Sequence, residues 1–127
     1  MLDRFRVYAV LPASDLDRAK RWWQDNVGMS PTTEDPGGAW YACADGTWVV
    51  ITPSGYAGTA QNTAVSFTVT GIEALMEELR SRGVTFEEYD MPGFKTDNGL
   101  FASGAYKAAW FKDSEGNIVE IAEVPQA

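Results

Sequence analysis

Several short stretches of the chain alternate between apolar and polar residues or are mostly apolar, and this pattern predicts β-strands. The predicted strands cover residues 5–11, 29–34, 39–43, 48–52, 63–69, 84–89, 106–112 and 118–124. Two longer stretches have apolar residues at helical spacing instead, which predicts helices over about residues 16–27 and 71–82. Gly28 and Gly83 follow these helices directly, and glycine favours the left-handed conformation that ends a helix.

The first helix also has a start signal. Ser14 or Asp15 is expected to cap it, because short polar side chains accept hydrogen bonds from the first free N–H groups. Asp17 lies three positions after Ser14, as the second member of a capping box does.

The order of the predicted elements is repeated along the chain. Residues 4–53 and 63–124 are each expected to form a strand, a helix and three strands, and residues 54–62 connect them. The extra length of the second unit lies in residues 91–105, which we interpret as a loop over a site or a disordered excursion. The predicted class is therefore α+β: two βαβββ modules within a single domain, residues 1–127, that form one curved, incomplete barrel with a central groove.

Composition narrows the classes of partner. The net charge is −8, which argues against nucleic acid and anionic membranes and is compatible with cationic small molecules. The sequence contains no histidine, so the commonest general base and metal ligand are both missing. Cys43 is the only cysteine, which excludes an intrachain disulfide and favours a reducing cytoplasm. No apolar run is long enough to cross a bilayer.

The last predicted hairpin carries an unusual carboxylate. Two strands are joined by a polar turn at residues 113–117, and Glu120 lies in the second strand between apolar neighbours. A carboxylate in that setting needs a partner, a metal ion or a cavity. The alternative is that Glu120 lies on an edge strand in water.

Two motifs resemble a known family. Ala13-Ser-Asp-Leu-Asp-Arg-Ala19 opens the first helix, and Asp113-Ser-Glu-Gly-Asn-Ile-Val-Glu120 forms the last hairpin. Together with the repeated modules, they resemble the vicinal oxygen chelate superfamily, which includes glyoxalase I, fosfomycin and bleomycin resistance proteins, and extradiol dioxygenases. The resemblance covers nearly the whole chain and implies an open barrel with its site in the groove.

The resemblance also implies four positions for metal ligands, one on the first and one on the last strand of each module. Those positions fall on Tyr8, Val50, Ala64 and Glu120. Alanine and valine cannot bind a metal ion, and a tyrosine phenol is a poor ligand at neutral pH. We therefore expect no metal and no cofactor.

Aromatic side chains are expected to line the groove together with a few polar groups, which suits a planar or amphipathic ligand. The predicted ligand-binding residues are Arg6, Tyr8, Trp40, Trp48, Val50, Ser66, Phe101, Tyr106, Trp110 and Glu120. Glu120 is expected to pair with a cationic ligand, with Arg6 or with the hydroxyl of Tyr8. Core packing is the alternative for each aromatic residue, and it is the stronger interpretation for Trp22 and Trp23.

The resemblance favours a metal-independent protein of the bleomycin-resistance type. It would bind an aromatic or cationic organic molecule, as in drug sequestration, and would form a homodimer. The alternative is a lyase, isomerase or dioxygenase-like enzyme with Glu120 and Tyr8 as acid–base groups, or with a metal site built from Glu88, Asp90 or Asp97. A third possibility is an interaction module whose groove is filled by Trp48 and Trp110.

Overall fold

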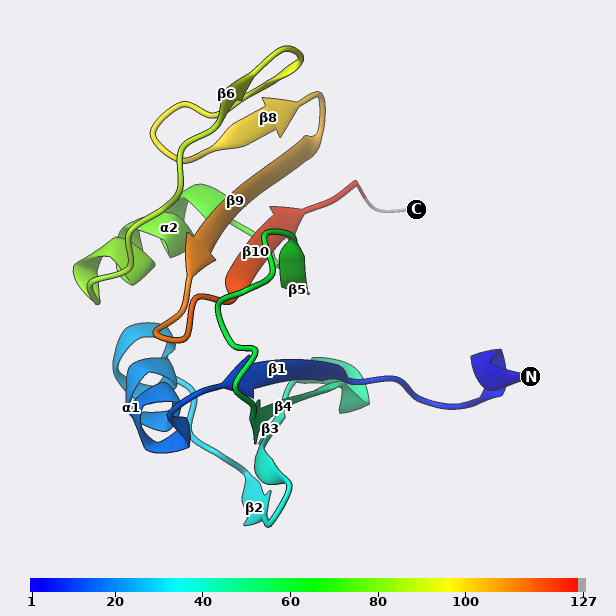
Figure 1. The fold of residues 1–127 in the computed structure, drawn as a ribbon. Coiled ribbons are helices and arrows are strands. Elements are labelled where there is room, and N and C mark those ends of the chain that lie inside the picture. The colour runs from blue at the N-terminus through cyan, green and yellow to red at the C-terminus, as the bar shows by residue number, and fades with distance from the viewer. Residues whose placement is uncertain (126–127) are drawn as a thin grey trace.

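The computed structural model describes residues 1–125 and has two open four-stranded sheets, each with one helix (Figure 1). The predicted α+β class and the two βαβββ modules are confirmed, and the sheets do not close into a barrel. Both helices lie on the same side of the sheets, at the left of Figure 1. The domain expected from the sequence also included residues 126–127, which lie outside the described residues.

The first sheet has the order β1-β4-β3-β2, with β1 parallel to β4 and the other neighbours antiparallel. Its elements are β1 (Ala9–Ala13), α1 (Leu16–Val27), β2 (Thr33–Asp35), β3 (Gly38–Ala42) and β4 (Trp48–Pro53). Two 3-10 turns belong to this module, η1 (Leu2–Arg4) and η2 (Ala44–Gly46).

The second sheet repeats this topology in the order β5-β10-β9-β8, with β5 parallel to β10. Its elements are β5 (Thr63–Thr68), α2 (Ile72–Ser81), β8 (Phe101–Ser103), β9 (Tyr106–Lys112) and β10 (Ile118–Glu123). A small hairpin, β6 (Asp90–Met91) and β7 (Phe94–Lys95), precedes β8. Strands β1 and β5 are the edges of their sheets and lie side by side.

The main core lies between the helices and the sheets. Its most buried large side chains are Leu11, Trp23, Tyr41, Ile51, Ile72 and Val119. Because successive strand residues point to opposite faces, Ala9 and Leu11 face this core while Val10 faces away from the helices. Trp23 is buried here and Trp22 packs against it, so the core interpretation of both residues is confirmed.

Helix α1 begins and ends nearly as the sequence predicts. Asp15 is the N-cap, and its side chain accepts a hydrogen bond from the N–H of Arg18 at 3.0 Å. Gly28 ends the helix in the left-handed conformation, with φ of 70°. The capping box predicted for Ser14 and Asp17 is wrong, because the Ser14 hydroxyl donates instead to Glu115.

The strand predicted over residues 5–11 begins later, at Ala9. Pairing with β4 starts at Ala9 opposite Val49, because β4 itself begins only at Trp48, after the η2 turn. Residues 5–8 therefore keep an alternating sequence without a neighbouring strand. Asp45-Gly46 is a dipeptide typical of two-residue hairpin turns, but in the structure it belongs to the 3-10 turn η2.

Two predictions in the second module are also corrected. Residues 84–89 form only a single bridge, between Phe86 and Phe111, and the side chains of Val84 and Phe86 are buried in the main core. Residues 91–105 are not structureless, since they contain β7, β8 and part of β6.

In the first module, the strand expected over residues 29–34 is reduced to β2. Within residues 1–125, no helix is long and apolar enough to span a membrane.

Candidate functional site

The face of the first sheet that points away from the helices carries an open hollow of about 360 Å³. We call it the ligand hollow; it is lined by Tyr8, Val10, Asp35, Pro36, Gly37, Trp40, Val50 and Thr52. Strand register explains the arrangement, because Val10 and Trp40 are both paired with Val50 on the neighbouring strand β4. The three side chains therefore form one row across the sheet.

Trp40 is held in place by two contacts. Its indole Nε1–H donates to the Asp35 carboxylate at 3.2 Å, and its ring meets the Tyr8 ring edge-on at a centroid distance of 4.8 Å. Asp35 is in turn fixed by the N–H of Gly37 at 2.8 Å. The hollow thus combines an oriented aromatic wall with a carboxylate, the two groups that attract a cation.

A second and larger hollow, of about 560 Å³, lies where the N-terminal end of β1 meets the C-terminal end of β5. We call it the seam hollow; it is lined by residues 7–9, 43–45, 47–49 and 65–68. Most of this lining is apolar, with the carboxylate of Asp45 as its charged group. Burial raises the pKa of the Cys43 thiol, so that side chain is neutral here. Tyr8 lines both hollows.

Glu120 lies on the corresponding face of the second sheet, in a different environment. Its carboxylate accepts a hydrogen bond from the Tyr106 hydroxyl at 2.9 Å. Burial and this bond to a carboxylate raise the pKa of Tyr106 to about 12. The partner is thus the hydroxyl of Tyr106 rather than that of Tyr8.

Aromatic side chains of the second module pack around this pair. Trp110 is only 7% exposed and lies against Phe94 and Tyr89, with centroid distances of 5.3 and 5.7 Å. Phe101 stacks on Phe94 at 4.7 Å. These rings occupy the face that in the first module is open.

The ten predicted ligand-binding residues are therefore divided among separate places. Tyr8, Trp40 and Val50 line the ligand hollow, and Tyr8, Trp48 and Ser66 line the seam hollow. Phe101, Tyr106, Trp110 and Glu120 lie together on the second sheet. Arg6 lines neither hollow, but its guanidinium lies beside Gly46, between the seam-hollow residues Asp45 and Thr47.

The sequence does not predict that the carboxylates of Asp35 and Asp45 belong to the two hollows. The pattern around Asp35 indicates only a turn, and the pattern around Asp45 indicates only a hairpin. The one available signal is the position of Asp35 immediately before Pro-Gly-Gly and close to Trp40, in a protein already expected to bind cations.

The four positions that the family resemblance assigns to metal ligands hold Tyr8, Val50, Ala64 and Glu120. Among residues 1–125, no group of three or more Cys, Asp or Glu side chains is placed to hold a metal ion. Glu88, which the sequence offered as a possible ligand, instead accepts hydrogen bonds from Thr96 and from the N–H of Gly99.

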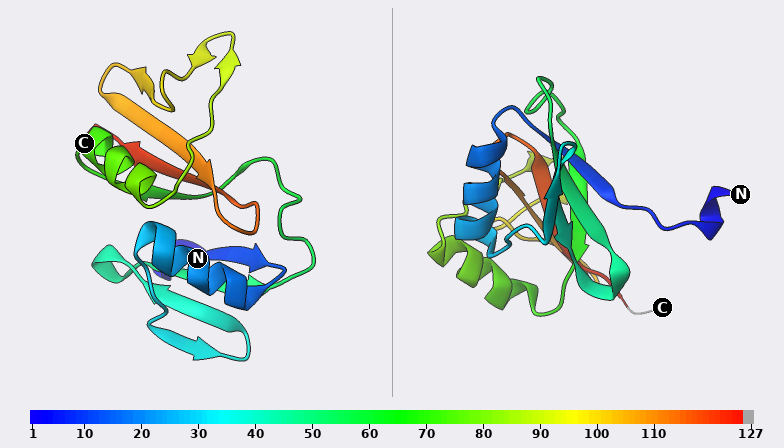
Figure 2. Two further views of the ribbon diagram at one scale, coloured as in Figure 1. Left: turned by 90° about the vertical axis from the view of Figure 1, so that its left-hand side faces the viewer. Right: turned by 90° about the horizontal axis from the view of Figure 1, so that it is seen from below.

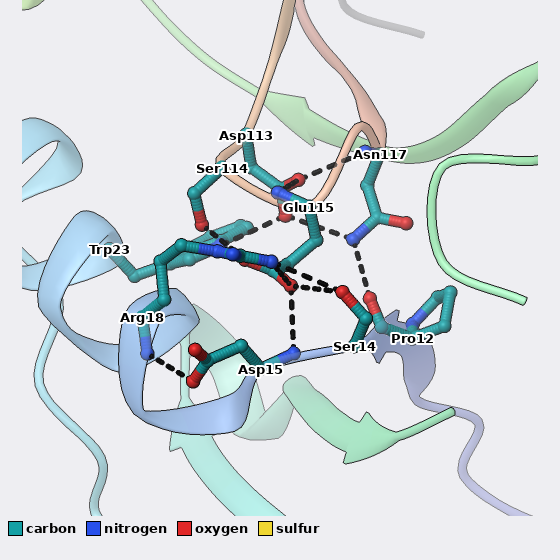
Figure 3. A network of polar contacts seen from close by, with 9 residues as sticks. All are labelled: Pro12, Ser14, Asp15, Arg18, Trp23, Asp113, Ser114, Glu115 and Asn117. Atoms are coloured by element: carbon teal, nitrogen blue, oxygen red, sulfur yellow. Dashed lines mark hydrogen bonds and ion pairs between the residues drawn. The ribbon is translucent and has the colours of Figure 1, made fainter. Parts of the chain in front are cut away.

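A polar network fixes the two modules to each other (Figure 3). The side chain of Glu115, in the turn before β10, is fully buried and accepts bonds from Arg18 Nε at 2.8 Å and Nη2 at 2.9 Å. The N–H of Asp15 and the hydroxyls of Ser14 and Ser114 also donate hydrogen bonds to this carboxylate. The Arg18 hydrogen bonds hold the pKa of Glu115 at about 2.

The same turn contacts α1 a second time. Asp113 accepts a bond from Trp23 Nε1 at 3.2 Å and from the Asn117 amide at 2.9 Å, and the same amide also donates to the carbonyl of Pro12. Helix α1 of the first module is thereby bonded to the last turn of the second, which holds the two sheets in a fixed relation.

Comparison with known proteins gives one family. Residues 6–121 match the model of the Glyoxalase/Bleomycin resistance protein/Dioxygenase superfamily. A search of curated proteins gives no significant match.

Several solved structures share the fold. UcmS2 superposes with a TM-score of 0.73 at 17% identity, covering 94% of this chain and 100% of that one. A glyoxalase/bleomycin resistance protein from Catenulispora acidiphila gives 0.70 at 19% identity, covering 95% and 99%. The fosfomycin resistance protein FosX from Listeria monocytogenes gives 0.68 at 14% identity, covering 95% and 93%. At these identities the likeness concerns the fold alone.

Proposed function

This chain belongs to the glyoxalase/bleomycin resistance protein/dioxygenase superfamily, and on that premise we propose that it binds a small organic cation with an aromatic part. Binding takes place in the ligand hollow and needs no metal ion. Such a protein sequesters its ligand, as a drug-binding resistance protein does.

The observation that carries this proposal is the contact between Asp35, Trp40 and Tyr8. An ammonium group over an indole face gains roughly 0.5–2 kcal/mol, and a neighbouring carboxylate adds to that attraction. The acidic chain as a whole increases the local concentration of cations.

A specific observation also supports an enzyme as the second candidate. The Tyr106 phenol, protonated at neutral pH, and the Glu120 carboxylate share a hydrogen bond of 2.9 Å, as an acid and a base do. The packed rings of Phe94, Phe101 and Trp110 surround this pair, so a substrate would have to displace them. The open ligand hollow is therefore the preferred site.

Three further features belong to the proposal. The proposal treats residues 1–127 as a single domain, because the Arg18–Glu115 network joins the two modules. A homodimer is also part of the proposal, because apolar side chains near the N-terminus are exposed and a second copy would cover them. A cytoplasmic location is consistent with Cys43 as the only cysteine.

The proposal predicts that phenethylammonium binds more tightly than the uncharged 2-phenylethanol, measured by calorimetry and by tryptophan fluorescence. Asp35→Asn and Trp40→Ala should each weaken phenethylammonium binding by roughly 3- to 30-fold, because each removes one of the two cation-attracting groups. Affinity for 2-phenylethanol should hardly respond to Asp35→Asn.

Glu78→Gln is the matched control for Asp35→Asn, since it removes one exposed negative charge from α2, remote from the hollow. Equal affinity for the two compounds, or equal effects of the two substitutions, would contradict the proposal. Loss of binding with Glu120→Gln alone would favour the second-sheet site instead.

A further inference from the structure

A third hollow, of about 250 Å³, lies under the connector, residues 54–62. We call it the connector hollow; its walls come from β1, from the connector, from the start of β5 and from the turn before β10. The left-hand view of Figure 2 shows the connector as a green loop that crosses from one module to the other. The hollow therefore lies at the junction of the two modules.

The connector is packed directly against the turn before β10. A Cβ atom at Gly116 would lie 2.8 Å from the Cα atom of Gly58, and one at Gly58 would lie 3.0 Å from the carbonyl oxygen of Glu115. Within the connector, the carbonyl of Tyr56 accepts hydrogen bonds from the N–H and the hydroxyl of Thr59. The roof of the hollow is thus preformed.

The hollow contains a buried hydrogen-bond acceptor. Asn117 lines it and is only 6% exposed. Its Nδ2 donates to the Asp113 carboxylate and to the carbonyl of Pro12, both at 2.9 Å. Because both partners are acceptors, the other side-chain atom must be the oxygen Oδ1. Figure 3 shows this oxygen pointing away from Asp113, and no group among residues 1–125 donates a hydrogen bond to it.

The chemistry of the hollow selects what can enter it. A buried amide oxygen without a partner is costly, and an N–H or O–H group that reaches it removes the cost. Of the described residues that line the hollow, none carries a charge, so an ion entering it would find no counter-charge. Most of the remaining lining is apolar. The hollow therefore fits a neutral hydroxyl or amide at the end of an apolar chain.

The connector hollow adjoins the ligand hollow. Val10 lines both, and its side chain is 55% exposed on the face away from the helices. Trp40, Val50 and Val10 lie on three neighbouring strands of the first sheet. Neighbouring strands are about 4.8 Å apart, so this row is about 10 Å long. A ligand that stands on Trp40 reaches the connector hollow by crossing the row.

We propose that the connector hollow receives the far end of the ligand, and that Asn117 Oδ1 accepts a hydrogen bond from it. The inference rests on the proposed function, because the ligand hollow holds the aromatic and cationic end. The ligand class is then an elongated aromatic amine with one positive charge. Its opposite end carries a neutral hydroxyl or amide, on an apolar chain long enough to cross Val10.

Three amines test the inference: N-benzylmethylammonium, N-benzylheptylammonium and N-benzyl-6-hydroxyhexylammonium. The two long amines have the same length, and only the last ends in a hydrogen-bond donor. By calorimetry, the hydroxyl compound should bind about 3- to 10-fold more tightly than the heptyl compound, because only it satisfies Asn117. Asp35-dependent binding of the short amine with equal affinities of the long ones would overturn this inference alone. Binding of none of them would overturn the proposed function as well.

A substitution that fills the hollow gives the second test. Ala64 is exposed on β5 and lines the connector hollow, so Ala64→Leu should weaken binding of the hydroxyl compound by about 5- to 20-fold and leave the short amine unchanged. Ala102→Leu is the matched control, since Ala102 is exposed on β8 of the second sheet, and it should affect neither compound. Equal effects of Ala64→Leu on the short and long amines would contradict the inference.

A third variant tests which amide accepts the hydrogen bond. Asn62 also lines the hollow, and its Nδ2 donates to the carbonyl of Thr63. In Asn62→Ala the preference for the hydroxyl compound over the heptyl compound should persist, because Asn117 is unchanged. Loss of that preference would identify Asn62 as the acceptor and overturn the role of Asn117.

Discussion

The carboxylate of Glu115 is fully buried, yet it remains charged because Arg18, Asp15 and Ser14 all donate hydrogen bonds to it. Its pKa of about 2 in the folded state lies below the ordinary value of 4.5. The folded protein therefore binds fewer protons than the unfolded chain between these pH values. The stability from this group is complete above pH 4.5 and is lost as the pH falls through about 2.

We accordingly expect the free energy of unfolding to fall by roughly 1–2 kcal/mol across that range because of Glu115 alone, a value reduced for the half-exposed Arg18. Denaturant titrations at several pH values measure this slope. Glu115→Gln should be less stable at pH 7 and should lack this part of the slope, whereas the exposed control Glu78→Gln should keep it. Identical slopes in both variants would refute the assignment.

At the scale of one element, the β2–β3 hairpin has a position, Gly38, where the backbone conformation and the close neighbouring strand require glycine. Its φ is 145°, and a Cβ atom there would lie 2.1 Å from the carbonyl oxygen of Ile51 on β4. Any side chain at this position forces β3 away from β4, which also carries Val50 at the base of the ligand hollow.

Gly38→Ala should therefore lower the free energy of unfolding by roughly 2–4 kcal/mol through overpacking and a positive φ. Gly55→Ala is the matched control, because a Cβ atom at Gly55 would have no other atom within 4 Å and the φ there is not in the left-handed region. Thermal unfolding of the two variants makes the comparison. Equal melting temperatures would show that β3 can shift without loss.

Element type could be read from the sequence where a pattern is local. The left-handed Gly28 and an N-cap at Ser14 or Asp15 depend on nearby residues and were predicted from them, and the structure has Asp15 as the cap. The start of β1 depends on where β4 begins, and β4 lies about forty positions further along the chain. Residues 84–89 have a strand pattern, but burial of Val84 and Phe86 is satisfied with a single bridge.

Side-chain partners were harder to predict than elements. The sequence indicated that Glu120 needs a partner, and the structure supplies Tyr106 from the neighbouring strand. Asp35 acquires its role only when the hairpin brings it against Trp40. Such contacts depend on strand register, which alternating patterns do not determine across a loop.

At the scale of the whole molecule, the main core contains buried side chains of both modules, and the Arg18–Glu115 network adds a bond between them. We therefore expect wild-type protein to unfold in a single transition that is the same by tryptophan fluorescence and by far-ultraviolet circular dichroism. Arg18→Met should lower the midpoint, and Arg21→Met, on the same helix, should not. Two separate wild-type transitions would mean that the modules fold independently.

The Arg18–Glu115 bond joins residues that are 97 positions apart in a chain of 127. During synthesis, helix α1 emerges from the ribosome long before the turn that receives it. Trp23 can pack against Tyr41 of its own module early, but its hydrogen bond to Asp113 forms only after the last hairpin has been made. Nascent chains of this protein are consequently exposed to chaperones until translation is almost finished, and pauses late in the message would prolong that exposure.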